Sequence, residues 1–567
     1  MKKLNYSNIT ATIRRIHQAT LRSKKTGIPI AELLDQDKEL RLKLQAQRLE
    51  DKQRRDFMKT VAGIGLGAGL LPIGNLAFAA QGGVNGQGDT RVAIIGAGAG
   101  GLRTAHRLMQ YGWTSTVYEA NTRIGGRMYS NSDYFSDERV VEWGGEFIST
   151  EHTAIRNLAH QLHLKLEDAN KLSVGNEETY LIDGQLYSES NLMDEWVGGL
   201  YETFKRAQMD APWQPLYNSF NDEHMRLDQM TAIDWLTEIG YDSAHWVHKL
   251  LMTDLVAEYG LLEENSALNL IYLLAWNTHN SGGLPLAGTD ERLHVVGGND
   301  LIPQRMAAEL HDGTIQIEHK LTEIHGDHSG PYSLKFANIP GYVEYDKLVL
   351  AMPYGLIREL EYFDPNITAQ FSDEKNLSIA EMLQADNGKV QMEFSDRHWD
   401  RVHTIDGEEI NQAARAYSNP DGFISTWEGE PGNTSPLGLL VDYNGGVEGK
   451  TLRKASGAND SNDFNNFFGI ANQRDVNRVM PQIEQIWPGI SAKYTGKALV
   501  SNWWDNPYSK GAFVSPAVNT MTVWWGAQWE TEGNIYFAGE ACDEEVWSYM
   551  DGAIRSGERV AQEIAQS

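Results

Sequence analysis

The 567-residue chain has a single cysteine, Cys542. One thiol cannot form an internal disulfide, so the chain is not a small secreted protein whose fold depends on disulfides. We expect its stability to come from its core and from any bound cofactor. Hydrophobic residues make up 41% and charged residues 22% of the sequence, which excludes a disordered chain.

Common hydrolase and metal motifs are also missing. Neither Gly-x-Ser-x-Gly nor His-Glu-x-x-His occurs, so nothing supports a hydrolase. His311, His319, His325 and His328 lie close together, but their spacing is irregular and no cysteine joins them. We therefore expect no metal site, and we expect His398 to be a surface or core histidine.

Positive charge is scarce except at the N-terminus. The net charge is −28, yet residues 1–79 contain 15 Lys and Arg against 7 Asp and Glu, so the rest of the chain carries −36. Such an acidic body repels nucleic acid and anionic lipid, and no nucleic-acid partner is expected. The charge could steer cationic substrates, although plain solubility is the interpretation we favour.

Residues 1–79 are predicted to be a leader. The run Arg54-Arg55-Asp56-Phe57-Met58-Lys59 precedes a Gly-rich apolar stretch that ends in Ala77-Phe78-Ala79, and together they look like a twin-arginine export signal. A membrane helix is the alternative, but the stretch is short and its glycines weaken a helix. With no second apolar stretch of about twenty residues, we expect a soluble protein in the periplasm or outside, delivered by the twin-arginine export machinery.

A glycine-rich turn between two predicted strands indicates a dinucleotide site. The apolar run Arg91–Ile95 leads into Gly96-Ala97-Gly98-Ala99-Gly100-Gly101, and a helix is predicted over residues 102–111. A second strand, Thr116–Tyr118, ends at Glu119. Strand, turn, helix, strand and acid in this order predict a bound dinucleotide.

The residues of this motif have separate physical roles. Gly96 permits the tight turn, Gly98 lets the backbone approach a pyrophosphate, and Gly101 lets the helix pack on the strand. The helix N-terminus offers free N–H groups and partial positive charge to phosphates. Glu119, 18 residues past Gly101, is placed to accept hydrogen bonds from a ribose.

A second element, Arg123-Ile124-Gly125-Gly126-Arg127, follows closely. Alone it would be a Gly-Gly turn between solvated arginines. Joined to the preceding motif, it resembles the element that wraps the pyrophosphate and flavin in glutathione-reductase-type FAD proteins. Over almost all of residues 90–567 the chain resembles the flavin-containing amine oxidase family, in its monoamine oxidase and L-amino acid oxidase branch.

Four more segments carry this resemblance in the family's order. They are Glu142–Ile148, beside the flavin ring in the family; Val296–Ile302, the middle Gly-Gly element; Trp503–Phe513, a wall of the substrate site; and Ile535–Glu540 with Tyr549–Ala553, the terminal strand, turn and helix. The last segment is a further backbone approach to an anionic ligand. Both ends of residues 90–567 should therefore converge on one cofactor.

The resemblance implies an α/β fold class. We expect a glutathione-reductase-type, Rossmann-like FAD-binding domain with an interleaved α+β substrate-binding domain and a helical insertion. The FAD-binding domain is expected over residues 90–150, 291–355 and 530–567, and the substrate-binding and helical domain over 151–290 and 356–529. Further predictions are amphipathic helices in 192–209, 232–239 and 245–259, strands in 315–350 and a buried strand over 347–353.

The resemblance also implies which residues contact FAD. The predicted contacts are Gly96, Gly98, Gly101, Glu119, Arg123, Gly126, Arg127, Gly144, Gly145, Glu146, Phe147, Trp504, Gly539, Glu540, Tyr549, Met550 and Ala553. Some family members bond FAD through a cysteine that would fall at Ala512, so non-covalent FAD is expected here. Cys542 is interpreted as a packed thiol.

Aromatic residues are expected to wall the reacting centre. By resemblance, Phe513 and Tyr549, with Trp547, hold a neutral amine so that its C–H bond points at the flavin, which is an effect of orientation. Ordinary core packing is the alternative for any one of them. The lysine that holds a water near the flavin in some members has no counterpart in residues 353–360, where Arg358 is the nearest base and a candidate catalytic residue.

The implied function is that of an FAD-dependent oxidase. Hydride passes from the substrate α-carbon to FAD, water hydrolyses the imine, and O2 reoxidises the flavin to give hydrogen peroxide. We favour L-amino acids as substrates; a mono- or polyamine oxidase is the main alternative. A desaturase of the same superfamily and a non-enzymatic flavoprotein are two others, and a homodimer is left open.

An L-amino acid oxidase needs a cation for the substrate carboxylate, ideally a bidentate arginine. In venom-type enzymes that arginine would fall near Phe147, which counts against a site of that type. Arg127 and Arg358 are the candidates to replace it. In favour of amino acids, residues 438–443 and the long inserted region look similar to exported bacterial amino acid oxidases.

Overall fold

The computed structural model describes residue 29 and most of the chain from residue 90 onward. The described ranges are 90–168, 177–260, 263–274, 291–405, 408–419, 421–430, 433–455, 464–504 and 506–567. The predicted export signal lies outside these residues, so export stays a prediction.

A five-stranded parallel sheet is built from stretches far apart in the sequence. In spatial order its strands are β24 (Ile535–Phe537), β13 (Lys347–Leu350), β1 (Val92–Ile95), β2 (Ser115–Tyr118) and β9 (Ile315–Gln316). All neighbouring pairs are parallel, and β1 and β13 are buried along their whole length, as central strands of such a sheet must be. The predicted mixed α/β fold with a parallel sheet is confirmed.

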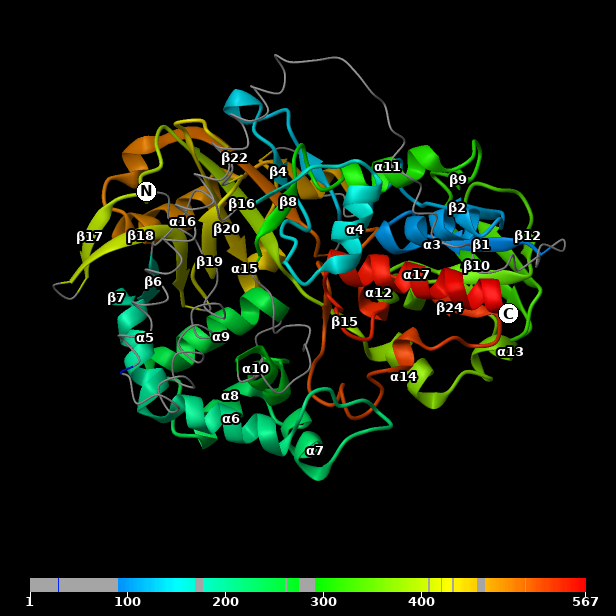
Figure 1. Cartoon of the computed structure of the whole chain (residues 1–567), viewed down its shortest axis with the longest axis horizontal. Helices are drawn as coiled ribbons and strands as arrows, with labels where there is room; N and C mark the ends of the chain where they lie inside the picture. The colour runs from blue at the N-terminus through cyan, green and yellow to red at the C-terminus, as the bar shows by residue number, and fades with distance from the viewer. Residues whose placement is uncertain are drawn as a thin grey trace, which may run out of the picture.

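Helices cover one face of this sheet. α3 (Ala99–Gln110) lies beside α17 (Met550–Gln566), and α11 (Leu301–Glu309) and α4 (Thr153–Gln161) flank this pair (Figure 1). A Cβ on Gly557 of α17 would lie only 2.5 Å from the carbonyl oxygen of Gly100, so glycine lets the two helices touch. The first and last described helices of residues 90–567 are therefore in direct contact.

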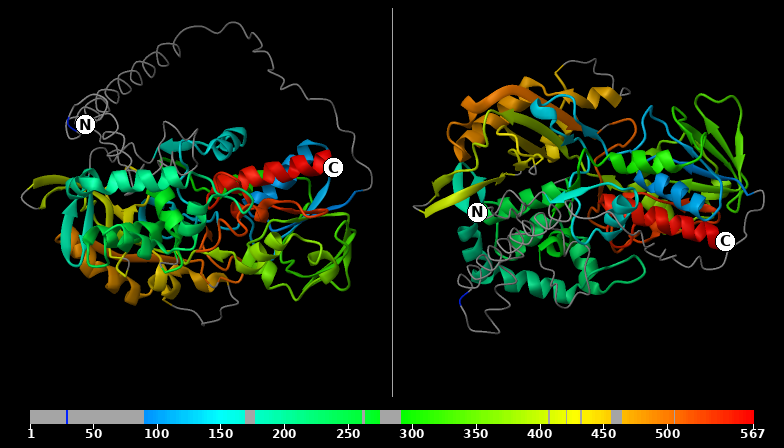
Figure 2. Two further views of the ribbon diagram at one scale, coloured as in Figure 1. Left: turned by 90° about the horizontal axis from the view of Figure 1, so that it is seen from below. Right: turned by 45° about the horizontal axis from the view of Figure 1, so that its top comes forward.

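A small sheet covers the other face. Its order is β12 (Val343–Tyr345), β11 (Tyr332–Phe336), β10 (Leu321–Gly326) and β14 (Tyr362–Phe363). In the left view of Figure 2 it lies across the parallel sheet from α17. The strands predicted within residues 315–350 are thus confirmed, although they divide between two sheets.

The parallel sheet, its helices and the small sheet form one lobe of the molecule. A nine-stranded sheet forms the other lobe. The path is β21 (Phe468–Ile470), β22 (Tyr494–Asn502), β16 (Gly388–Phe394), β20 (Gly438–Asn444), β19 (Ser425–Glu428), β18 (Glu408–Ser418), β6 (Glu177–Ile182) and β7 (Gln185–Ser188), and β17 (Val402–Ile405) pairs with β18. α16 (Gln473–Ile486) packs on one face, where Val390 and Ala416 join its apolar side. Side chains alternate along a strand, so the preceding residues, Lys389 and Arg415, belong to the opposite face of the sheet, which we call the inner face.

Residues 189–274 are mainly helical where described. The elements are α5 (Glu189–Glu195), the π-turn η3 (Trp196–Leu200), α6 (Tyr201–Asp210), α7 (Asp222–Asp228), α8 (Ala232–Glu238), α9 (Trp246–Tyr259) and α10 (Ala267–Leu274). The prediction that α9 is amphipathic was wrong, because ten of its 14 residues are buried. It packs against β6, β18 and β19 as well as α8 and α10, so it has little solvent-facing side.

Short elements complete the fold. They are α12 (Tyr354–Arg358), α13 (Pro365–Thr368), α14 (Asp373–Glu381), α15 (Gly446–Thr451), β3 (Ser130–Asn131), β4 (Val141–Glu142), β5 (Leu166–Asp168), β8 (Leu293–Val295), β15 (Leu383–Gln384), β23 (Val514–Ser515), and the 3-10 turns η1 (Ser136–Glu138), η5 (Phe464–Phe467), η6 (Ile490–Lys493), η7 (Ala527–Trp529) and η8 (Glu540–Cys542). Among the described helices, none has the length and apolar character needed to span a membrane.

Candidate active site

One large cavity joins the two lobes. It has a volume of about 350 Å³ and runs from the carboxyl ends of β1 and β2 to the inner face of the nine-stranded sheet. This is the size range of cofactor and substrate pockets. The carboxyl ends of parallel strands are also where α/β proteins usually bind ligands.

The glycine-rich turn lies at one end of the cavity. Gly96 has φ +107°, and a Cβ there would lie 2.4 Å from the carbonyl oxygen of Ala351, so only glycine makes this turn. Gly98 has space instead: the nearest atom to a Cβ would be the Cα of Gly126, at 3.9 Å. No side chain caps the N-terminus of α3, whose residue Ala99 lines the cavity.

Gly101 is not brought to the cavity. A Cβ on it would lie 2.0 Å from the carbonyl oxygen of Gly96 and 3.1 Å from the Cβ of Ala351. Its role is therefore the helix-to-strand packing that the sequence predicted, and the structure gives no support for a direct contact with a cofactor.

Glu119 is held firmly at the end of β2. Its Oε2 accepts the N–H of Ala97 at 2.8 Å, and its Oε1 accepts the N–H of Asn121 at 2.8 Å. Burial raises the pKa of Glu119, although these N–H donors oppose that effect. The carboxyl group lines the cavity beside Gly98, where a ribose hydroxyl could reach it.

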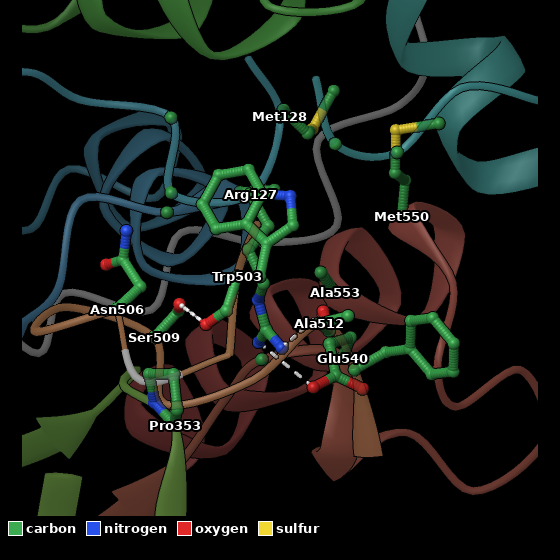
Figure 3. A pocket seen from close by; sticks show the side chains of 18 of the residues that line it. Arg127, Met128, Pro353, Trp503, Asn506, Ser509, Ala512, Glu540, Met550 and Ala553 are labelled. Carbon is green, nitrogen blue, oxygen red and sulfur yellow. Dashed lines mark hydrogen bonds and ion pairs between the residues drawn. The ribbon is translucent and has the colours of Figure 1, made fainter. Parts of the chain in front are cut away.

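The two arginines of the second glycine-rich element also line the cavity. Arg123 lies over the ring of Tyr129 at 4.0 Å. Arg127 donates to the side-chain oxygen of Gln384 at 2.9 Å. It also donates to the carbonyl oxygen of Ala512 at 2.8 Å and to Glu540 at 3.0 Å (Figure 3). Three acceptors of its own chain already engage the guanidinium of Arg127, and none of its nitrogens is buried without a partner, so it is a weak candidate for binding a substrate carboxylate.

The terminal segment returns to the same cavity, as predicted. Gly539, Glu540, Tyr549, Met550 and Ala553 all line it. α17 starts at Met550 without a side-chain cap, so a second helix N-terminus adds partial positive charge here.

These features fit FAD. A dinucleotide needs donors and positive potential for its pyrophosphate, close backbone approach, and an acceptor for a ribose hydroxyl. The cavity supplies two uncapped helix N-termini, the open glycines Gly98 and Gly539, and the carboxyl group of Glu119.

The segment after β4 forms the middle of the cavity wall, to which Gly144, Gly145, Glu146 and Phe147 contribute. Glu146 binds Lys389 of β16 through Oε2 at 2.7 Å and the indole N–H of Trp427 through Oε1 at 2.8 Å. Lys389 also donates to the carbonyl oxygens of Gly144 at 2.8 Å and Glu142 at 3.1 Å. All three ammonium hydrogens of Lys389 thus have acceptors within the chain.

A second carboxyl group lies beneath this segment. Glu142 accepts the N–H of Asn299 and the hydroxyl of Ser130, both at 2.7 Å, and does not line the large cavity. Burial raises the pKa of Glu142 to about 8.

The three predicted aromatic residues are brought to one cavity. Phe513 and Tyr549 are half-buried, and Trp547 is buried against Trp525 and Tyr259, with ring centroids 5.0 and 5.8 Å away. Trp547 therefore has a packing role as well as a place in the wall. How these rings face a bound flavin stays a prediction.

Two other predicted site residues do not reach the cavity. The ammonium nitrogen of Lys450 lies 4.7 Å from the centroid of the Trp504 ring. The neighbouring Trp503 lines the cavity instead. The prediction chose the wrong one of two adjacent tryptophans. Arg358 is absent from the lining, and it donates to the carbonyl oxygens of Ile379 and Met382, both at 2.9 Å. Its position supports neither a catalytic role nor carboxylate binding.

The sequence reasoning missed a buried arginine at the sheet end of the cavity. Arg415 of β18 lies 4.9 Å from the ring of Trp427, and its Nη2 is 3.1 Å from Glu291. Its Nε is buried and has no hydrogen-bond partner in the described part of the chain. Burial lowers the pKa of Arg415, but nearby Tyr417, Glu291 and further carboxylates outweigh burial and raise it overall. The arginine stays charged.

A sequence signal for these residues existed but was weak. Arg415 is a lone charge in Ala413-Ala414-Arg415-Ala416-Tyr417, whereas Lys389 shares the strand Gly388–Phe394 with Glu393 and gives a weaker signal. A charge inside an otherwise apolar strand indicates a buried functional group. Which face it points to depends on the partner strands, and the local sequence does not give these.

Cys542 and His398 do not line the cavity, and no metal cluster is found near it in the described residues. No cluster of three or more His, Cys, Asp or Glu that could hold a metal occurs within the described ranges. Cys542 is buried away from the cavity, with its Sγ 3.8 Å from the carbonyl oxygen of Gln528, which confirms a packed thiol. His398 is also buried, and its Nε2 lies 2.8 Å from the carbonyl oxygen of Pro488.

Comparisons with known proteins agree with this geometry. The family model described as "Flavin containing amine oxidoreductase" matches residues 99–565. An amine oxidase [flavin-containing] of Danio rerio is 23% identical over 497 residues, covering 83% of this chain and 85% of that protein. An L-amino-acid oxidase of Siganus canaliculatus is 24% identical over 494 residues, covering 84% and 85%.

Solved structures share the fold. The cyclohexylamine oxidase from Brevibacterium oxydans IH-35A matches with a TM-score of 0.68 and 18% identity, covering 84% of this chain and 99% of that one. Wild-type putrescine oxidase bound to putrescine matches with a TM-score of 0.66, the same identity and the same coverage.

Proposed function

Because the chain belongs to the family of flavin-containing amine oxidoreductases, we propose that it is an FAD-dependent oxidase whose substrates are L-amino acids. The observation that carries the choice of amino acids is Arg415, a charged and buried arginine in the cavity wall with an unpaired Nε–H. A carboxylate on the substrate would supply the missing acceptor.

Bound FAD would supply the acceptor for the hydride from the carbon that bears the amine, and O2 would be the final oxidant, reduced to hydrogen peroxide. Gly98, Glu119 and the starts of α3 and α17 would hold it. Phe513, Trp547 and Tyr549 would exclude water and fix the direction of the reacting C–H bond.

Arg415 is suited to orienting a carboxylate. Trp427 stacks on its guanidinium and Glu291 holds one of its nitrogens, so the plane of the guanidinium is fixed before a substrate arrives. The hydroxyl of Ser425, on the neighbouring strand β19, also lines the cavity, and it too is buried without a partner in the described part of the chain. Together these groups could hold a carboxylate at the sheet end of the cavity.

The alternative function is the oxidation of amines that lack a carboxylate, and the observation that favours it is the ion pair of Glu291 with Arg415. An arginine satisfied within its own chain need not bind a substrate. A matched panel separates the two functions: peroxide release from L-norleucine against pentylamine, and from L-phenylalanine against phenethylamine. We expect the amino acid of each pair to have the higher kcat/KM by about tenfold or more. Preference for the amine in both pairs would make the protein an amine oxidase.

The flavin is expected to be bound without a covalent link. Ala512 offers no thiol, and Cys542, the sole cysteine of the chain, is not part of the cavity lining. Acid precipitation should therefore leave the flavin in the supernatant and a colourless pellet, read from the absorbance of both fractions. Yellow colour that stays with the precipitated protein would contradict this.

The leader is proposed to direct export by the twin-arginine route. Replacing Arg54 and Arg55 together by lysine should keep the full-length precursor in the cytoplasm, since the signal depends on the arginine pair. Cell fractionation with detection of the chain measures this. Replacing Lys24 and Lys25 by arginine, in the same leader, is the control and should leave export unchanged. Export of the double-lysine variant at the normal level would refute the proposed route.

A further inference from the structure

The C-terminal end of α9 forms part of the cavity wall. Ala257, Glu258 and Tyr259, its last three residues, all line the cavity. The last carbonyl groups of a helix carry partial negative charge, and Glu258 adds a carboxylate at the same place. This end of α9 is therefore an environment for a positively charged group.

An unsatisfied acceptor lies beside it. Asn387 is 1% exposed and lines the cavity, and its Oδ1 is buried with no hydrogen-bond partner in the described ranges. Its Nδ2 donates to the carbonyl oxygens of Val256 at 3.1 Å and Ala257 at 3.4 Å, which ties the side chain to the last turn of α9. A buried amide oxygen without a donor costs stability, so a ligand N–H donor would be favoured here.

The balance of charge at this end of the cavity points the same way. Among the described residues that line this end, the cations are Lys389 and Arg415, and the carboxylates are Glu146, Glu258 and Glu291. Lys389 and Arg415 already pair with Glu146 and Glu291, so the five groups sum to one negative charge. A substrate that brings only a carboxylate would make this end more negative.

Aromatic rings complete the surroundings. Tyr259, Trp547 and Tyr443 also line the cavity, and aromatic faces attract ammonium and guanidinium groups. Carboxylates at several sides, Glu258 among them, raise the pKa of the buried Tyr443 phenol beyond the effect of its burial. The field at this ring is thus negative.

We propose that the end of α9, with Glu258 and Asn387, is a subsite for a positively charged group at the far end of the substrate, so that the preferred L-amino acids are those with a basic side chain. The proposal rests on the proposed function, because it assigns the side chain of the same substrate. Arg415 would bind the carboxylate, and the α9 end would bind the side-chain ammonium or guanidinium.

Four compounds separate the two parts of this assignment. L-Lysine has both the carboxylate and the distal ammonium, L-norleucine only the carboxylate, cadaverine only the distal ammonium, and pentylamine neither. Peroxide release by the purified holoenzyme gives kcat/KM for each. We expect L-lysine to exceed L-norleucine by about tenfold or more, as for a hydrogen bond between charged groups. L-Arginine should likewise exceed L-citrulline, its neutral isostere.

Other results of the four-compound assay would overturn either the cation subsite or the proposed function. Equal turnover of L-lysine and L-norleucine would overturn the cation subsite and leave the proposed function standing. Turnover of cadaverine well above pentylamine, with neither amino acid oxidised, would overturn the proposed function and support the subsite. Preference for norleucine over lysine would overturn the subsite outright.

A variant tests whether Glu258 carries the effect. In Glu258→Gln the ratio of kcat/KM for L-lysine to that for L-norleucine should fall about tenfold, mainly through KM. Glu344→Gln is the matched control, since it removes the same charge from an exposed residue of β12. A parallel loss for both substrates in Glu258→Gln would assign Glu258 to the reacting amine and overturn the proposal.

Binding gives a readout that does not depend on turnover. D-Lysine carries the same charges as L-lysine but presents a differently directed C–H bond. Calorimetric titration of the holoenzyme should show D-lysine binding at least about tenfold more weakly to Glu258→Gln than to the wild type or Glu344→Gln. Unchanged affinity in all three proteins would count against the subsite even if Glu258→Gln loses activity.

Discussion

Replacing Arg415 by methionine should lower kcat/KM for L-amino acids by about 100-fold or more. The substitution removes the proposed charged partner of the substrate carboxylate and leaves Glu291 in the half-buried wall without its cation, and each effect is worth roughly 1.5–5 kcal/mol. The carboxylate of Glu291, no longer paired with Arg415, would also repel the carboxylate of the substrate. Turnover of pentylamine should fall much less, so the ratio of norleucine to pentylamine, measured by peroxide release, is the diagnostic quantity.

A second buried arginine provides the control. Arg139 is fully buried, lies 3.4 Å from Glu430 and donates to the carbonyl oxygens of Leu437 and Gly429, but it does not line the large cavity. Arg139→Met should lower thermal stability as Arg415→Met does, with an unchanged norleucine-to-pentylamine ratio. Should Arg415→Met keep the wild-type ratio, Arg415 would not be the carboxylate-binding group, and an amine without a carboxylate would become the favoured substrate.

Replacing Gly98 by leucine should remove most of the bound flavin. The position has room in the protein, since the nearest atom to a Cβ would be the Cα of Gly126 at 3.9 Å, so the chain should still fold. The leucine side chain would instead occupy the cavity beside the start of α3, where the pyrophosphate is expected. The purified variant should keep less than about a tenth of the wild-type flavin, because a close-packed site has no spare volume.

The measurement is the ratio of flavin to protein absorbance, together with thermal unfolding with and without added FAD. Gly198→Leu is the matched control: Gly198 is exposed, and no heavy atom would lie within 4 Å of its Cβ. It should retain its flavin and be stabilised by added FAD. A Gly98→Leu protein that purifies with a full complement of flavin would show that the pyrophosphate is not bound at this turn.

The cofactor half of the site could be predicted from the sequence because its signals are local. Gly96, Gly98 and Glu119 lie within 24 residues, and their roles follow from backbone geometry that neighbouring residues specify. A turn that only glycine can make, a helix start and an acid at a strand end need no knowledge of distant contacts. All of them lie where the motif predicted.

The sequence was a poorer guide to which residue of a predicted segment reaches the cavity. The sequence could not choose between Trp503 and Trp504, because adjacent residues point in different directions and the loop has no regular period. It also placed Arg358 near the site by proximity to a buried strand, whereas the guanidinium bonds to the carbonyl oxygens of Ile379 and Met382. Side-chain direction in loops and short helices is set by tertiary contacts.

The proposed substrate half of the site depends on tertiary structure alone. Arg415, Glu258 and Lys389 come from three different elements and Asn387 from the loop before β16, and none is part of a motif that their neighbours define. They meet because alternate residues of β16 and β18 face inward and because α9 ends against the loop before β16. By itself the sequence determined the fold class and the cofactor, whose recognition depends on short-range backbone geometry. Which charges surround the substrate depended on strand order and register, which long-range pairing fixes.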